Sequence, residues 1–279
     1  FRRIHFVWEN NRLGITNEVY PPFEPIEVED DTVGVVMRDY RVEGLGLWTS
    51  VCARGNESGY RELLANPMRL VANGEPLQGE GKFTRTADHE VVYEGAAQHP
   101  AVEIQTKTTT EYDGCQRVEL TLKPSNTEAG LDTLHLDVPL KDEMAPLWHC
   151  ATTALRRNPV GATPEGDGRV WDSRDFPDGE WHGNFHPYLW VGGEERGICF
   201  FADNDRNWVL KKNEDGTFAP CQELIRRNGV LTMRINLVQE PVQLEEPRTI
   251  VFGLMASPGK PMPQEWRKVQ FQRGYKDYP

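Results

Sequence analysis

The sequence predicts an all-β fold, a large sandwich of two antiparallel sheets with few short helices. Apolar and polar residues alternate with a period of two over long stretches, as they do in strands with one buried face. The 279 residues include 25 Gly and 20 Pro, scattered in the manner of many short turns. No long amphipathic helix separates the expected strands, which excludes the crossover connections of doubly wound and barrel α/β folds. Two sheets packed face to face satisfy this pattern.

The chain divides into three parts. Ile4–Trp8 is a short mixed apolar stretch that predicts a strand, and the prolines of Tyr20–Pro25 favour an extended connector over a helix. We therefore interpret residues 1–25 as a strand and linker from a preceding module. Residues 26–258 form the sandwich domain, and residues 259–279 are a linker toward a further module.

The first strands of the sandwich follow in order. Val33–Arg38 alternates in polarity, and Trp48–Ala53 is the next apolar run. Tyr60–Leu64 is expected to be a short helical or turn segment. Met68–Val71 predicts a strand that ends at the turn Asn73-Gly74.

The clearest element is a hairpin of Ala101–Tyr112 with Cys115–Lys123. Its connection contains Asp113-Gly114, a pair that tight hairpin turns prefer. Both arms alternate in polarity, so one face is expected to be buried and the other wet. Leu134–Leu140 continues the pattern and predicts a neighbouring strand.

Asn158–Gly179 is rich in Gly, Pro, Asp and Arg and has no periodicity, so it predicts a long loop of functional importance. Strand patterns return after it, and Pro263–Lys268 is the one segment expected to be helical, beginning at a proline. The expected later strands are Tyr188–Val191, Gly197–Ala202, Trp208–Lys211, Cys221–Arg227, Val230–Val238 and Arg248–Met255.

Composition limits the function classes. The net charge of −12 opposes binding to phosphate backbones and anionic lipid, so no nucleic-acid partner is expected. No stretch approaches the roughly 18 apolar residues of a membrane span. The five cysteines are widely separated, without a CxxC pair, and predict mainly buried thiols with at most one or two disulfides. No metal site and no cofactor are expected.

Carbohydrate is the ligand that the segment from residue 171 to residue 190 suits best. It combines aromatic rings, on which the CH faces of sugars stack, with carboxylates, histidines and an amide that bind hydroxyl groups. Packing in the core is the competing interpretation for each tryptophan. The candidate ligand contacts are Trp171, Asp172, Trp181, His182, Asn184 and His186.

Catalytic and metal interpretations of the same segment are weaker. His182 and His186 would share one face of a helix, but Gly183 and Pro187 argue against a helix there. Adjacent carboxylates at residues 142–143, 194–195 and 245–246 lie at expected turns or strand ends and are interpreted as solvated surface. Asp203-Asn204-Asp205 is interpreted as a turn with Asx hydrogen bonds, because the downstream Glu of a calcium loop is missing.

Several separated runs resemble one family. Trp190–Trp208 resembles a tryptophan-to-tryptophan run in the large β-sandwich module of multidomain proteins similar to glycoside hydrolase family 123. Phe252–Pro261 resembles the last strand of that module and the link after it. Arg61–Met68 and Tyr20–Pro25 match its early part, so the resemblance covers about residues 18–267.

The resemblance implies a galactose-mutarotase-like supersandwich that precedes a (β/α)₈ catalytic barrel. In such relatives the barrel carries the acidic pair that hydrolyses N-acetylated glycosides, so no catalytic residue is carried over to this chain. It further implies a multidomain parent that cleaves O-glycosyl bonds in polysaccharide degradation, in an extracytoplasmic (periplasmic or secreted) location.

Three hypotheses follow. The first is a non-catalytic supersandwich module of a glycoside-hydrolase-like protein, which supports the barrel and contacts glycan. The second is an autonomous sugar epimerase or polysaccharide lyase, in which His182 or His186 with Glu180 supplies acid–base catalysis. The third is an interaction scaffold without a ligand.

Overall fold

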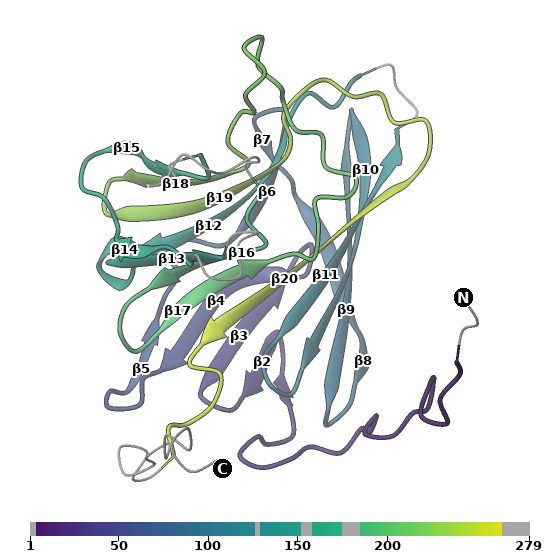
Figure 1. The fold of residues 1–279 in the computed structure, drawn as a ribbon, viewed down its shortest axis with the longest axis vertical. Helices are drawn as coiled ribbons and strands as arrows, with labels where there is room; N and C mark the ends of the chain where they lie inside the picture. Colours follow the sequence, from purple (N-terminus) through teal and green to yellow (C-terminus); the bar gives the residue numbers. More distant parts are fainter. Residues whose placement is uncertain (1–3, 126–128, 152–157, 175–184, 264–279) are drawn as a thin grey trace.

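The fold is all-β, as the sequence predicts. The computed structural model describes residues 4–125, 129–151, 158–174 and 185–263, and in these ranges the regular elements are strands and one short 3₁₀ turn, η1 (Asp142–Met144). Every pairing between the strands is antiparallel, and Figure 1 shows their arrangement.

The strands form three sheets. Sheet A has the order β1 (Glu27–Glu29), β2 (Thr32–Val35), β3 (Arg38–Glu43), β4 (Leu47–Arg54) and β5 (Tyr60–Glu62). Sheet B has the order β15 (Gly168–Asp172), β18 (Gln222–Arg227), β19 (Val230–Val238), β12 (Leu134–Lys141), β6 (Arg69–Ala72) and β7 (Glu75–Pro76). Sheet C has the order β14 (Val160–Ala162), β13 (Leu147–Ala151), β16 (Tyr188–Gly192), β17 (Gly197–Phe201), β20 (Arg248–Ser257), β11 (Gln116–Pro124), β10 (Val102–Glu111), β9 (Glu90–His99) and β8 (Gly79–Thr86).

The sequence predicts two sheets, and the structure has three, because one layer of the sandwich consists of two smaller sheets. Sheet A contacts sheet C where the Thr106 hydroxyl donates to the Leu45 carbonyl at 2.8 Å. Sheet B contacts sheet C where the rings of Trp148 and Trp171 lie 5.0 Å apart. Since the sheets share one core cluster, the architecture is still a sandwich, with sheet C as one layer and sheets A and B as the other.

Strand alternation sets the core, as expected from the sequence. In the predicted hairpin, Ile104 pairs with Leu122 and both are fully buried, whereas their neighbours Gln105 and Thr121 face outward. The turn contains Gly114 with φ +78°, a conformation that favours glycine. The hairpin is therefore confirmed, with its arms at β10 and β11.

Glycine at position 95 allows sheets A and C to approach closely. Gly95 lies on the inner face of β9, and a Cβ atom there would lie 2.6 Å from the Gly44 carbonyl oxygen and 2.8 Å from the Leu45 Cα. Both atoms belong to the backbone between β3 and β4. Sheet A thus packs directly against the backbone of sheet C at this point.

Arg38 fixes the point where the chain leaves the last strand. Its side chain is fully buried and donates to the carbonyls of Asp113 (2.8 Å), Ala256 (3.0 Å) and Gly259 (2.7 Å), while Nε donates to Val36 (3.2 Å). One guanidinium therefore ties β3 to the β10–β11 turn and to the residues that follow β20. A further bond from the Met262 N–H to the side-chain oxygen of Asn56 holds the same exit segment (2.8 Å).

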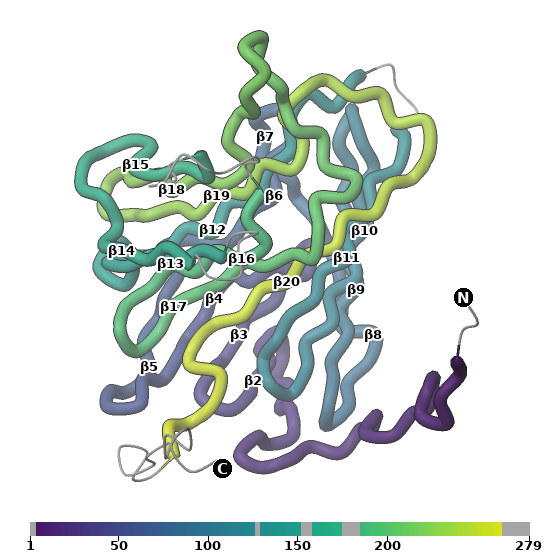
Figure 2. The backbone as a smooth tube through the Cα atoms, in the orientation of Figure 1, coloured from purple at the N-terminus to yellow at the C-terminus, as the bar shows by residue number. Residues whose placement is uncertain are grey.

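Two segments differ from their expected structure near sheet A. Residues 4–8 are coil and turn rather than a strand, because no neighbouring strand pairs with them, and Val7 is fully exposed. Figure 2 shows the purple N-terminal part of the tube, which begins at the right and runs past the lower ends of β8 and β9 toward β2. Tyr60–Glu62 is strand β5, not a helix or turn, since it pairs with the end of β4.

Two further segments differ elsewhere. The expected loop 158–179 contains β14 and β15, whose long-range partners leave no periodicity in the local sequence. Trp208–Lys211 is not a strand, because Val209 makes only an isolated bridge to Val238. The expected helix Pro263–Lys268 lies, apart from its first residue, outside the described residues.

Candidate functional site

The predicted contact segment begins at the end of β15 and ends just before β16. Trp171 and Asp172 are the last residues of β15, and His186 lies two residues before β16. The structure brings these three side chains to one buried junction between sheets B and C. Three further predicted contacts, Trp181, His182 and Asn184, lie outside the described residues.

Trp171 is a core residue. Its side chain is 4% exposed, and its ring lies 5.0 Å from that of Trp148 and 6.0 Å from that of His186. A sugar stacks on an aromatic ring only where one face of that ring is open. Trp171 therefore serves the packing of sheet B on sheet C in this structure.

Asp172 is a buried carboxylate held by arginines. Arg174 donates to it from Nε (3.1 Å) and Nη2 (2.8 Å) as well as from its backbone N–H (2.9 Å), and Arg169 Nε lies 3.4 Å away. Burial alone raises the pKa of Asp172, but the bonds from Arg174 outweigh it, so the pKa lies below its ordinary value. The carboxylate stays ionised and anchors the chain after β15.

His186 is fully buried and hydrogen-bonded. Its Nε2 lies 2.9 Å from the Ser173 carbonyl, and its backbone N–H and C=O both pair with the side-chain amide of Gln222. Burial lowers the pKa of the imidazole, which is therefore neutral near pH 7. The ring joins the strand ends and offers no exposed base in this conformation.

In two of the three acidic pairs one member makes a structural contact, and the other members, together with Glu245 and Glu246, are exposed as expected. Asp142 accepts from Arg226 Nε at 2.8 Å. Glu195 accepts from the Glu57 N–H at 2.9 Å and from the Ser58 hydroxyl, so it fastens that loop to the β16–β17 turn. The turn at 203–205 has the expected Asx bond, from the Arg206 N–H to the Asn204 side chain.

A salt bridge on the outer face of sheet B gives an electrostatic test of the fold. Asp137 on β12 faces Arg234 on β19, and two bonds of 2.7 and 2.8 Å join the carboxylate and the guanidinium. Burial opposes ionisation of Asp137, but hydrogen bonds from Arg234 and His135 overcome it and lower its pKa to about 2.

We predict that Asp137 stabilises the fold by about 2 kcal/mol above pH 4. Its folded pKa of about 2 lies below the ordinary value of 3.8, so this stabilisation is present at neutral pH and disappears as the pH falls from about 4 to 2. Urea unfolding of Asp137→Asn between pH 2 and 7 should show the deficit at high pH only. The exposed Asp132→Asn serves as control, and a deficit that is the same at every pH would contradict the prediction.

The outer face of sheet C, which points away from sheets A and B, carries two aromatic rings that lie flat on glycines. A Cβ atom at Gly253 would lie 2.2 Å from Cε2 and Cζ of Phe201 and 2.8 Å from Cε1, which places it over the face of the ring. Gly197 lies likewise under the indole of Trp190, whose Nε1 donates to the Ser257 hydroxyl at 3.1 Å. Sequence analysis missed these pairs.

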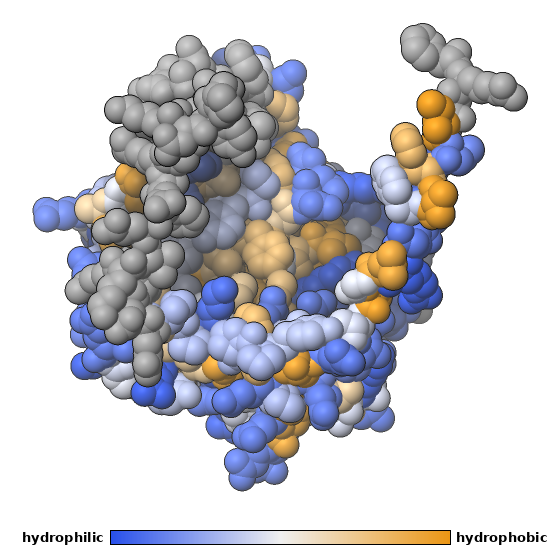
Figure 3. All heavy atoms as spheres, turned by 60° about the horizontal axis from the view of Figure 1, so that its bottom comes forward, coloured by the Kyte–Doolittle hydropathy of each residue, from blue (hydrophilic) through white to orange (hydrophobic). Residues whose placement is uncertain are grey.

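A cavity of about 640 Å³ opens on the same side of sheet C, above β11 and β20. Its lining includes the apolar residues Phe201, Val251 and Phe252. Figure 3 shows one face of the molecule, with a hollow that has a hydrophobic floor and hydrophilic walls. The cavity wall is polar on the side of the 202–207 turn. We call the following set the Phe201 face: Arg117, Phe201, Asp203, Asn204, Arg206, Val251 and Gly253.

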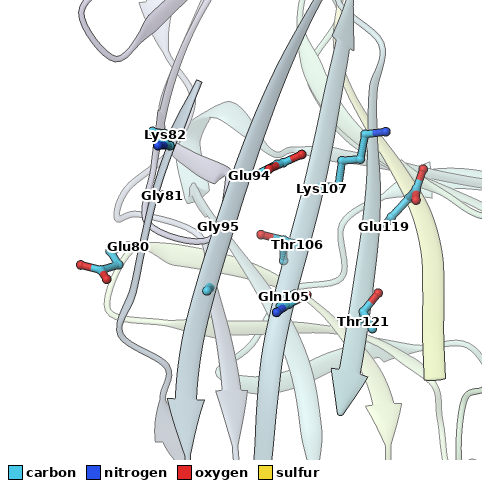
Figure 4. Close-up of a pocket in the computed structure, with 11 residues that line it drawn as sticks. Glu80, Gly81, Lys82, Glu94, Gly95, Gln105, Thr106, Lys107, Glu119 and Thr121 are labelled. Atoms are coloured by element: carbon cyan, nitrogen blue, oxygen red, sulfur yellow. The ribbon is translucent and has the colours of Figure 1, made fainter. Parts of the chain in front are cut away.

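A second groove, of about 650 Å³, follows β8 to β11 and is lined mostly by polar and charged residues. Its charged side chains alternate in sign across the strands. In the strand register Lys107 lies opposite Glu94 on one side and Glu119 on the other, and Lys82 lies opposite Glu94. Figure 4 shows these side chains along the strands. With no aromatic residue in its lining, this groove lacks a stacking surface.

The described ranges hold no group of three or more metal-ligating side chains. All five cysteines fall within them, and each is a free thiol. The part of the chain that the structure describes contains no helix long and apolar enough to span a membrane.

The chain matches the family model described as glycoside hydrolase 123, third domain, over residues 26–207, which is more than half of its length. No curated protein matches it.

Solved structures align over most of the chain at low identity. A galactose mutarotase related enzyme from Lactobacillus acidophilus aligns with a TM-score of 0.42 and 5% identity, over 85% of this chain and 98% of that chain. A putative aldose 1-epimerase from Escherichia coli K12 gives a TM-score of 0.41 and 8% identity (84% and 98% covered). An aldose epimerase homologue from C. elegans gives a TM-score of 0.39 and 8% identity (84% and 98% covered).

Proposed function

The chain belongs to the family of the third domain of glycoside hydrolase 123, and from this membership we propose that it is a non-catalytic module of a larger glycoside hydrolase. The module supports the catalytic (β/α)₈ barrel of the parent and contacts carbohydrate. The observation that carries the proposal is the family match itself, which runs from the residue before β1 to beyond β17.

Four of the described carboxylates are engaged in structural contacts, which supports a non-catalytic role for these four groups. Glycoside hydrolysis uses two carboxyl groups that face each other about 5–9.5 Å apart, one of them a general acid with a raised pKa. Asp137 and Asp172 have lowered pKa values and are bound to arginines. Asp142 and Glu195 are engaged in structural contacts.

The exit segment after β20 supports the role as a buttress. Arg38 and Asn56 hold the backbone at Gly259 and Met262, so the chain leaves the sandwich in a fixed direction. A module attached there would be oriented by these contacts. We propose that the attached module is the catalytic barrel and that these contacts set its position.

One observation keeps a sugar epimerase or lyase as the second candidate. Glu111 lines the cavity of the Phe201 face, and burial, followed by repulsion from Asp113 and Glu90, raises its pKa. A carboxyl with a raised pKa suits acid–base chemistry. The cavity lining nevertheless contains no histidine to act as its partner.

We expect the isolated chain to release no sugar from nitrophenyl glycosides and to leave the anomeric equilibration of free hexoses at its uncatalysed rate. The parent protein should hydrolyse glycosides, and deletion of this chain should lower the melting temperature of the barrel by several degrees. Hydrolysis by the isolated chain would contradict the non-catalytic role. Accelerated equilibration that is lost in Glu111→Gln would favour the epimerase instead.

A further inference from the structure

We propose that the Phe201 face binds an uncharged saccharide, with one sugar ring stacked on Phe201. The inference rests on the proposed function and deepens it, because it places the carbohydrate contact on the outer side of β17, β20 and β11. This location is distinct from the segment 171–186, in which the described candidate contacts Trp171, Asp172 and His186 are buried.

The first step is that Phe201 is a preformed platform. Phe201 pairs directly with Gly253, so both point to the same side of sheet C, opposite to the buried Phe200 and Phe252. Because Gly253 has no side chain, the ring of Phe201 lies flat across β20 with one face on the backbone. Phe201 also lines the cavity. A flat ring held in this way offers a stacking surface without a large loss of side-chain entropy on binding.

The second step is that polar side chains surround this platform. Arg117 pairs in register with Gly253 and points to the same side, next to the ring. Asp203, Asn204 and Arg206 follow β17 directly and are exposed in the turn beside it. Carboxylate, amide and guanidinium groups are the usual partners of sugar hydroxyls. An aromatic floor with a few polar groups around it is the composition of a small-molecule site.

The third step concerns the charge of the ligand. The cavity lining carries two arginines, Arg117 and Arg206, and two carboxylates, Glu111 and Asp203. These charges balance, so the site gives no net attraction to an anionic uronate or to a cationic amine. A volume of about 640 Å³ lies within the range of small-ligand pockets. The ligand is therefore a neutral mono- or oligosaccharide.

The test is a calorimetric and NMR titration of the full chain with methyl glycosides of neutral hexoses, of N-acetylhexosamines and of a hexuronate. We expect the neutral glycosides to bind and the uronate to bind more weakly. Phe201→Ala should weaken binding about tenfold or more, and Phe201→Trp should retain it. Phe218→Ala, which removes another partly exposed phenylalanine outside the cavity, should bind like the wild type.

Each outcome decides the proposal. Equal affinity of Phe201→Ala and wild type, with unchanged melting temperatures, would overturn it, and so would the absence of binding by every glycoside at the limit of solubility. Gly253→Ala tests the same site through a second residue. Its new Cβ would lift the ring of Phe201 while both side chains remain apolar, so glycoside binding should weaken in this variant too. Failure here leaves the module role intact, since that role is measured in the parent protein.

Discussion

An Arg38→Met variant is expected to unfold with a free energy about 3–4 kcal/mol lower than that of the wild type, as measured by urea denaturation. The substitution keeps most of the side-chain volume and removes the donors. Four backbone carbonyls, those of Val36, Asp113, Ala256 and Gly259, would lose a charged donor, and the Ala256 carbonyl is buried. Unsatisfied buried acceptors of this kind are costly.

Arg41→Met is the matched control for Arg38. It lies on the same strand, its side chain is about half exposed, and its partner Glu43 is also at the surface. Exposed ion pairs contribute about 0–1 kcal/mol, so this variant should unfold almost like the wild type. Equal stability of the two variants would contradict the role that we assign to Arg38 in holding the exit segment.

Gly95→Val is expected to destabilise the fold by about 3 kcal/mol or more, or to prevent folding. The first atom of any side chain at this position would meet the backbone of Gly44 and Leu45 at 2.6 and 2.8 Å. Neither can move without separating sheet A from sheet C. Circular dichroism and urea unfolding measure the effect.

Ala96→Val is the control for Gly95 because residue 96 is the next residue of β9 and is exposed. Valine suits strands at least as well as alanine, so its stability should be unchanged or slightly higher. Near-wild-type stability of Gly95→Val would show that the sheets do not pack backbone to backbone here.

Much of the fold could be predicted from local patterns, because alternation and turn residues act within one hairpin. The arms around Asp113-Gly114 are examples, with register from Val102 to Pro124. Strands that pair across a long sequence separation show no such local pattern. Strand β15 was missed for this reason, since its residues pair only with β18 and show a bulge that disturbs the period.

The candidate site was less predictable than the fold. Residue type alone suggested Trp171, Asp172 and His186, but burial and hydrogen bonds decide what each group does, and these depend on tertiary contacts. The Phe201 platform needs a glycine directly opposite on a strand from the other end of the module. An aromatic residue that pairs with a strand glycine is a signal that could have found it, once the register was known.

The most direct test of the proposed sugar site on the Phe201 face is a crystal structure of the chain with the neutral glycoside that binds best in titration. We predict electron density for a sugar ring parallel to Phe201, at about 4 Å from it, with hydroxyl groups near Arg117 and the turn at residues 203–206. Density for the sugar on a different surface, with the cavity over β20 and β11 empty, would contradict saccharide binding at the Phe201 face.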